Sequence, residues 1–83
     1  MQLLVRFDTT GYETWKAAYD GGSEDRQHSG VTQMQLWHDA DTPNRVWGLY
    51  QASDREKARS HFKTRAKLNE NTTDIQLHFL RTA

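Results

Sequence analysis

The chain has 83 residues, of which 35% are hydrophobic, 11% are aromatic and none is cysteine. This length allows one small domain with a thin core, and the absence of cysteine excludes disulfide bonds as its reinforcement. Eleven basic residues balance eleven acidic ones, so bulk attraction to nucleic acid or to an anionic membrane is not indicated. The N-terminus lacks a signal-peptide pattern, and no apolar run approaches the ~20 residues of a membrane span. We therefore expect a single domain over residues 1–83, located in the cytoplasm, with no membrane or nucleic-acid partner.

The first expected elements are a two-sided strand and an amphipathic helix. Gln2–Phe7 carries apolar side chains at alternate positions and Leu4 on the opposite side, which is typical of a central strand. Thr10 and Glu13 have the spacing of a capping box, and the aromatic residues that follow recur at helical intervals. The pattern predicts a helix that begins at Thr10 and ends before the glycine pair at 21–22.

The middle of the chain predicts a short helix and then a β-hairpin. Ser23 caps a turn that runs to His28, and Val31–Asp39 follows as a polar strand suited to a sheet edge. The segment 40–44 contains the only proline and connects this strand to Arg45–Ala52, which is apolar on both sides and therefore central. Regular alternation in the edge strand places Thr32, Met34, Leu36 and His38 on one side and Val31, Gln33, Gln35 and Trp37 on the other.

The last expected elements are a helix and a half-buried strand. Ser53 and Glu56 form a second capping box, and Asn69 and Asn71 mark the end of the helix that it opens. The Ile75–Leu80 segment alternates between apolar and mostly polar residues, as a half-buried strand does. The apolar stripe of the helix consists of Ala58, Phe62 and Ala66.

The element order is β-α-β-β-α-β, which predicts a ferredoxin-like α+β fold. In this fold a four-stranded antiparallel sheet has its first and third strands in the centre and helices on one face. The other face would then carry Leu4, Trp47, Leu80 and either Trp37 or Leu36, which are too apolar for a solvated surface. A second copy of the same sheet is the simplest cover, so the sequence predicts a homodimer.

Short features spread over nearly the whole chain are shared with one superfamily. They are Trp15-Lys16, Tyr19-Asp20, Arg26, Gly30-Val31, the 39–44 turn, Val46, the 54–58 segment, Phe62 and the closing strand. With these features the chain resembles the dimeric α/β-barrel proteins, which include antibiotic-biosynthesis-type monooxygenases, polyketide cyclase-like proteins and stress-responsive proteins. The resemblance implies a homodimer whose two sheets pack into a barrel and, in enzymatic members, a ligand cavity between sheet and helices.

The histidines offer candidate catalytic groups without a metal site. His28, His38, His61 and His78 lie on different expected elements and lack the regular spacing of metal ligands. His38 and His78 are the stronger candidates, because both lie on expected strands beside large aromatic residues, where a neutral imidazole could shuttle a proton. The alternative, which base rates favour, is that both are polar strand residues facing water.

Six aromatic side chains are candidates for a ligand pocket: Trp15, Tyr19, Trp37, Trp47, Tyr50 and Phe62. Such a lining suits a planar hydrophobic molecule, although base rates favour a role in the core or the dimer interface. The Arg45–Tyr50 segment lacks the Lys/Arg-Gly-Phe run of RNA-recognition modules. A basic stripe at four-residue spacing, which we interpret as a solvated helix face, consists of Arg55, Arg59, Lys63 and Lys67.

Together these patterns predict a small homodimeric α/β-barrel protein that binds or transforms an apolar or aromatic metabolite. The prediction includes no metal and no nucleotide cofactor, because no ligand spacing or phosphate-binding loop is present. The alternative is a non-enzymatic structural or interaction protein whose aromatic residues serve only the core and the dimer interface. A ligand cavity of ~300 Å³ or more would favour the first prediction over the second.

Overall fold

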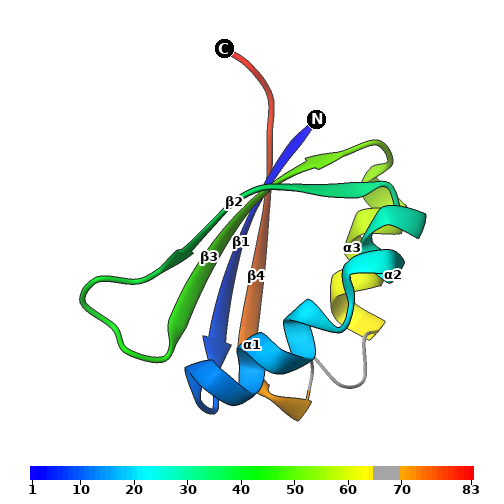
Figure 1. Cartoon of the computed structure of the whole chain (residues 1–83). Helices are drawn as coiled ribbons and strands as arrows, with labels where there is room; N and C mark the ends of the chain where they lie inside the picture. The colour runs from blue at the N-terminus through cyan, green and yellow to red at the C-terminus, as the bar shows by residue number, and fades with distance from the viewer. Residues whose placement is uncertain (65–69) are drawn as a thin grey trace.

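The protein is a single antiparallel sheet with helices on one face. The computed structural model describes residues 1–64 and 70–83. Its elements are β1 (Gln2–Thr9), α1 (Tyr12–Asp20), α2 (Ser23–His28), β2 (Val31–His38), β3 (Arg45–Ala52), α3 (Arg55–Thr64) and β4 (Thr72–Leu80). The strand order is β2-β3-β1-β4, and all three neighbouring pairs are antiparallel. This arrangement confirms the predicted ferredoxin-like α+β fold with its first and third strands in the centre (Figure 1).

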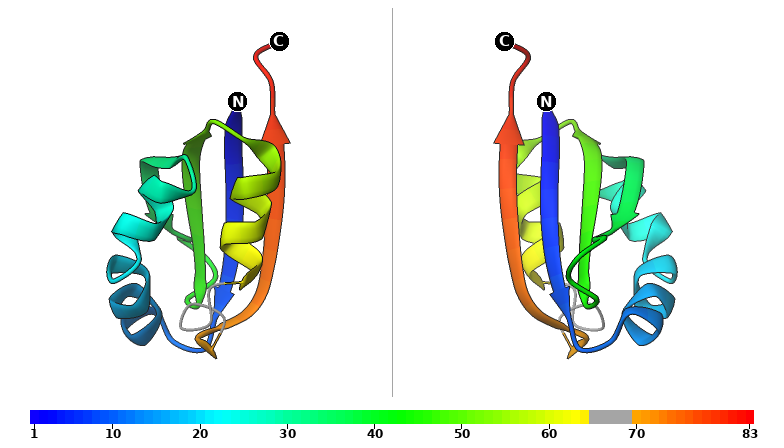
Figure 2. Two further views of the ribbon diagram at one scale, coloured as in Figure 1. Left: turned by 90° about the vertical axis from the view of Figure 1, so that its right-hand side faces the viewer. Right: turned by 90° about the vertical axis from the view of Figure 1, so that its left-hand side faces the viewer.

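The helices cover one side of the sheet as two groups. Figure 2 shows α1 and α2 over the β2–β3 half and α3 over the β1–β4 half. Alternate residues of the two central strands point into this layer and are fully buried. Within the described residues, no helix is long and apolar enough to cross a membrane. The core consists of Leu3, Val5, Phe7, Trp15, Tyr19, Val31, Val46, Tyr50, Ala52, Ala58 and Phe62.

The helix starts differ from the expected capping boxes. Gly11 precedes α1 and no side chain caps this helix, so the predicted role of Thr10 is wrong. At α3 the capping side chain is that of Asp54, whose Oδ1 accepts the Lys57 backbone N–H at 2.9 Å, and the predicted role of Ser53 is also wrong. A carboxylate next to the first turn satisfies an unpaired N–H and also suits the helix dipole. Of the two residues predicted to mark the end of this helix, Asn69 lies outside the described residues and Asn71 lies in a turn.

A bulge in β2 overturns the predicted alternation of this strand. Gln33 pairs with Tyr50 and Gln35 pairs with Leu49, so Met34 is an extra residue in the ladder. Before the bulge Val31 and Gln33 face the helices, and after it Leu36 and His38 face them. The regular alternation predicted from the sequence placed these two pairs on opposite faces of the sheet. The inserted residue explains the difference, since one extra position reverses every side chain that follows it.

Gly30 connects α2 to β2 in a conformation that other residues rarely adopt. Its φ is +71°, and a Cβ at this position would collide with the Ser53 hydroxyl. The Gly30 carbonyl accepts the Ser53 N–H at 3.0 Å, which ties the end of α2 to the start of the segment before α3. This contact positions Ser29 close to α3.

The sheet face opposite the helices carries an apolar patch. We call Leu4, Leu49, Trp47, Trp37 and Leu80 the open-face patch. Leu4 pairs with Leu49, and Trp37 pairs with Trp47, across neighbouring strands on this side. Trp37 is 46% exposed and Leu80 is 42% exposed. The structure therefore confirms that apolar residues lie on the helix-free face, which the right panel of Figure 2 turns toward the viewer.

Ion pairs border the open-face patch at one end. Arg6 pairs with Asp74 at 2.9 Å, and Arg45 pairs with Asp8 at 2.8 Å. The four residues come from the three neighbouring strands β3, β1 and β4. The open face is thus divided into an apolar region and a charged region.

Asp39 organises the turn after β2 and holds one tryptophan of the open face. Its Oδ1 accepts the backbone N–H groups of Asp41 and Thr42 at 2.9 Å each, and its Oδ2 accepts the Trp47 indole N–H at 2.7 Å. The bond from Trp47, followed by those from the two backbone groups, lowers the pKa of Asp39 to about 2. The charged carboxylate is therefore the form that the fold stabilises.

Replacing Asp39 by asparagine is expected to lower stability at neutral pH and to remove one acid-sensitive contribution. Because the folded pKa of Asp39 lies below its ordinary value of 3.8, its contribution is present above that pH and is lost as the pH falls toward 2. Urea unfolding of the wild type and Asp39→Asn at several pH values would show a gap at pH 6 that closes near pH 2. Asp41→Asn is the control, and a gap independent of pH would contradict this account.

Candidate functional site

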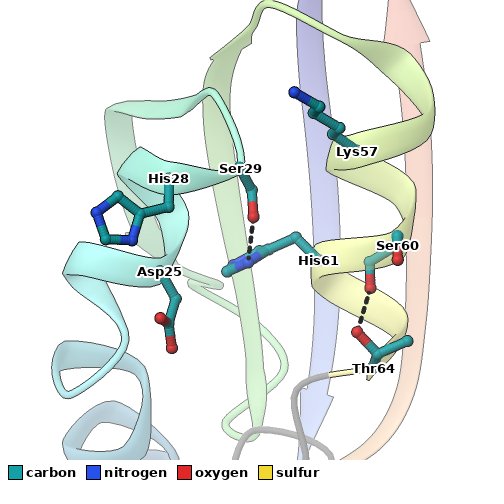
Figure 3. Close-up of a pocket in the computed structure, with 7 residues that line it drawn as sticks. All are labelled: Asp25, His28, Ser29, Lys57, Ser60, His61 and Thr64. Atoms are coloured by element: carbon teal, nitrogen blue, oxygen red, sulfur yellow. Dashed lines mark hydrogen bonds between the residues drawn. The ribbon is translucent and has the colours of Figure 1, made fainter.

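A pocket of about 370 Å³ lies between α2 and α3. Asp25 and His28 line it from α2, and Lys57 and His61 line it from α3; the close-up in Figure 3 shows the His61 ring pointing toward Ser29. The Gly30 contact described above brings the end of α2 to this position. The described residues that line it are Asp25, His28, Ser29, Lys57, Ser60, His61 and Thr64.

Ser29 and His61 meet inside this pocket. The Ser29 Oγ and the His61 Nδ1 are 3.3 Å apart (Figure 3), and His61 is only 7% exposed. The imidazole packs edge-on against the Phe62 ring, with centroids 4.9 Å apart, so the core fixes its orientation. An imidazole beside a hydroxyl is an arrangement used in general acid–base catalysis. The pocket therefore contains a positioned acid–base group.

The pocket offers hydrogen-bonding groups, one ammonium group and two imidazoles. Lys57 contributes a cation, Asp25 a carboxylate, and Ser60 a hydroxyl on the exposed side of α3. The Thr64 hydroxyl donates to the Ser60 carbonyl at 2.7 Å and so remains beside the pocket wall. Among the described residues no group of three or more His, Cys, Asp or Glu could hold a metal ion. Because every lining residue is polar or charged, a small molecule would be held here mainly through its polar substituents.

The structure places the predicted catalytic histidines on opposite faces of the sheet. His38 faces the helices at the outer end of β2, stacks on Tyr12 with centroids 4.3 Å apart, and donates a hydrogen bond from Nε2 to the Pro43 carbonyl. His78 is exposed on β4, opposite Leu4 on the open face. The two are therefore not brought together, and neither lines the pocket between α2 and α3. A catalytic role for them stays a prediction.

The sheet also divides the six predicted aromatic residues into two sets. Trp15, Tyr19, Tyr50 and Phe62 are at most 2% exposed on the helix side. Their rings contact one another, with centroid distances of 4.8 Å for Trp15–Tyr19 and 5.1 Å for Tyr50–Phe62. Trp37 and Trp47 lie opposite each other on the open face. A ligand-binding role for the set stays a prediction, and the sheet prevents all six from lining one pocket.

Two buried tyrosine hydroxyls form a chain to the edge strand. The Tyr50 hydroxyl donates to the Tyr19 oxygen at 2.8 Å, and the Tyr19 hydroxyl donates to Gln33 Oε1 at 2.5 Å. The Arg26 guanidinium lies 3.8 Å from the centre of the Tyr19 ring and donates to the Tyr19 carbonyl. Burial raises the pKa of Tyr19 and raises the pKa of Tyr50 well above its ordinary value. Both hydroxyls are therefore protonated donors at neutral pH rather than bases.

Sequence reasoning missed the pairing of Ser29 with His61. The two residues are 32 positions apart and have no motif spacing, and His61 was only one of four histidines. Glycine after a short helix was the available signal, because it predicts a sharp turn at Gly30. It does not indicate which helix Ser29 would contact.

The fold and the pocket define this protein as a compact member of the ferredoxin-like α+β class. Its solved structural neighbours are antibiotic biosynthesis monooxygenase-like proteins, NIPSNAP proteins and the oxygenase SnoaB. No known protein family matches the sequence, and no curated protein sequence matches it. The similarity is therefore one of structure, and it confirms the predicted fold.

Three solved structures illustrate the similarity. SnoaB, a cofactor-independent oxygenase from Streptomyces nogalater, has a TM-score of 0.69 and 16% identity, over 99% of this chain and 93% of that one. A NIPSNAP domain protein from Burkholderia xenovorans has a TM-score of 0.67 and 13% identity, over 100% and 95% of the two chains. An antibiotic biosynthesis monooxygenase has a TM-score of 0.63 and 15% identity, over 100% and 99%. All three match this chain over nearly their whole length.

Proposed function

We propose that the protein is a homodimer that binds a small apolar or aromatic metabolite without a metal or nucleotide cofactor. The single observation that carries the assembly is the open-face patch, which leaves Trp37 and Leu80 almost half exposed on a surface that α1, α2 and α3 do not cover. The ligand site is the pocket between α2 and α3. Its Ser29–His61 pair binds a hydroxyl or carbonyl substituent, and the His61 imidazole is the group that exchanges a proton with it.

Two features of the open face support a second copy as its cover. Leu4 and Leu49 lie side by side on the two central strands, so the middle of the patch is apolar. The ion pairs at one end of the face restrict how two copies can superimpose, because charged groups avoid an apolar partner surface. A twofold pair can bury the leucines and keep these charges at its border.

The ligand proposal has support from the fold and from the pocket. SnoaB, with a similar fold, is a cofactor-independent oxygenase. The cavity exceeds the ~300 Å³ at which small-molecule sites begin, at about 370 Å³. The imidazoles of His28 and His61 are both among the residues that line it.

Leu49→Asp is expected to convert the dimer into a folded monomer. The new carboxylate would lie in the middle of the interface without a partner, whereas the helix-side core would keep all its contacts. Light scattering at ~10 μM should give twice 9.7 kDa for the wild type and 9.7 kDa for the variant. Ala17→Asp, at an exposed position of α1, makes a charge change of the same sign and should stay dimeric. A monomeric mass for the wild type would contradict the proposed homodimer.

Binding of 1-naphthol is the probe for the pocket, because it is a neutral, flat molecule with one hydroxyl group. Amide NMR shifts should change at Ser29, His61 and Thr64 during the titration. Ser60→Phe, which fills the pocket from an exposed position, should abolish these changes, and Thr14→Phe on exposed α1 should keep them. Unchanged shifts at the pocket would contradict the ligand site.

A second candidate function is that of a structural or interaction protein without a ligand. The observation that favours it is the mutual packing of Trp15, Tyr19, Tyr50 and Phe62, which places these rings entirely in the core. A dimeric wild type that fails to bind 1-naphthol and carries no retained small molecule in native mass spectrometry would support this alternative.

A further inference from the structure

The basic stripe of α3 lies against the outer edge of the sheet. A groove of about 210 Å³ runs between α3 and β4. The groove lies on the other side of α3 from the pocket, because helix positions 55, 59 and 63 form one face and positions 57, 60, 61 and 64 form the opposite one. The groove is lined by Arg55, Arg59, Lys63, Ile75, Leu77 and Phe79.

Two guanidinium groups lie over the aromatic floor of this groove. The Arg55 and Arg59 guanidinium carbons are 4.7 Å and 5.6 Å from the centre of the half-buried Phe79 ring. A guanidinium at such a distance is attracted by the face of the ring and is held in a limited range of positions. The stripe is therefore more than the solvated face that its spacing suggested, and its predicted fourth member, Lys67, lies outside the described residues.

The two arginines of the groove differ in their ion pairing. Arg59 shares one N–H with the exposed Glu56 carboxylate at 3.0 Å. Within residues 1–64 and 70–83, no ion pair joins Arg55 to a carboxylate, and no acidic side chain lines the groove. A guanidinium presents five donors, so both arginines keep N–H groups available for a ligand.

We infer that this groove binds a small organic acid, with an aromatic or alkyl body on the β4 floor and its carboxylate on Arg55. Ile75, Leu77 and Phe79 would take the body out of water, and the guanidinium would donate two parallel hydrogen bonds to the carboxylate. The site is separate from the proposed pocket and does not depend on it. Its ligand class also differs, because the pocket takes a neutral molecule and the groove takes an anion.

The test compares 3-phenylpropanoate with its neutral amide, 3-phenylpropanamide, by isothermal titration calorimetry. The acid should bind the wild type at least about 10-fold more tightly than the amide. Arg55→Gln should lower the affinity for the acid about 10-fold and leave the affinity for the amide unchanged. Lys16→Gln, which removes the same charge from α1, should leave both affinities unchanged. Phe79→Leu keeps the floor apolar but removes the ring and its contacts with the two guanidinium groups, so it should lower the affinity for both ligands.

Three outcomes would overturn the inference. Equal affinities of acid and amide would show that the cations do not recognise the ligand. If the Arg55→Gln variant bound the acid as tightly as the wild type does, the carboxylate would have to bind elsewhere. Loss of acid binding in the pocket-filling Ser60→Phe variant would assign the acid to the pocket between α2 and α3, which would overturn the groove while leaving the proposed function intact. Conversely, a failure of 1-naphthol to bind would not affect the groove experiment.

Discussion

Gly48→Ala is expected to destabilise the protein by ~2 to 3 kcal/mol, although only one methyl group is added. Gly48 lies in the middle of β3 and faces the helices, and the Tyr50 ring folds back over it. A Cβ at this position would lie 2.6 Å from Tyr50 Cε2 and 2.7 Å from Cζ, which is far inside contact distance. The φ of Gly48 is not positive, so the expected loss arises from the ring and not from the backbone. Urea unfolding followed by circular dichroism measures it.

Two further variants make this prediction specific. Gly11→Ala is the control, because a Cβ at Gly11 would meet no atom within 4 Å. In a Tyr50→Leu background, Gly48→Ala should cost less than it does in the wild type, since the colliding ring is gone. Equal costs in the two backgrounds would show that the ring does not cause the loss.

Raising the pH above 10 is expected to destabilise the protein steeply. Burial raises the folded pKa of Tyr50 and of Tyr19, so the unfolded chain releases these protons first. Their contribution is present below the ordinary tyrosine pKa of about 10 and is lost as the pH rises through the folded values. Each tyrosine should reduce the free energy of unfolding by up to ~1.4 kcal/mol per pH unit in this range. Urea unfolding between pH 9 and 11.5 measures the slope.

Tyr50→Phe separates this effect from general alkaline denaturation. The variant cannot ionise at position 50, so the slope of its stability against pH should be shallower above pH 10. Tyr12→Phe removes a tyrosine outside the hydroxyl chain, at the stack with His38, and should keep the wild-type slope. A wild-type slope in Tyr50→Phe would mean that its buried hydroxyl does not govern alkaline stability.

The fold could be predicted because its signals are local and strong. The two-sided apolarity of Gln2–Phe7 and Arg45–Ala52 correctly indicated central strands, and the polar Val31–Asp39 segment correctly indicated an edge. Capping was harder to predict, because the neighbours Ser53 and Asp54 are equally good capping residues in sequence and only the backbone decides which of them precedes α3. Gly11, in an extended conformation, precedes α1 without a side-chain cap, and Asp54 occupies the corresponding position before α3.

The candidate site was less accessible to sequence reasoning because it depends on packing between distant elements. Ser29 contacts His61 only because the Gly30 turn brings the end of α2 to α3. The six aromatic residues were grouped as one candidate pocket lining, because strand alternation does not show which face of the sheet meets the helices. Trp37 and Trp47 therefore could not be separated from Tyr50 until the register was known.

The bulge in β2 also determines which length changes this strand can tolerate. Met34 is the one residue between Gln33 and Leu36 without a partner in β3, so deleting it would leave a regular ladder with Val31, Gln33, Leu36 and His38 on their present faces. Deleting Met34 should therefore change the free energy of unfolding very little. An insertion after Leu36 would instead turn Trp37 toward the helices. The strand can thus accept a deletion at Met34 but not an added residue three positions later.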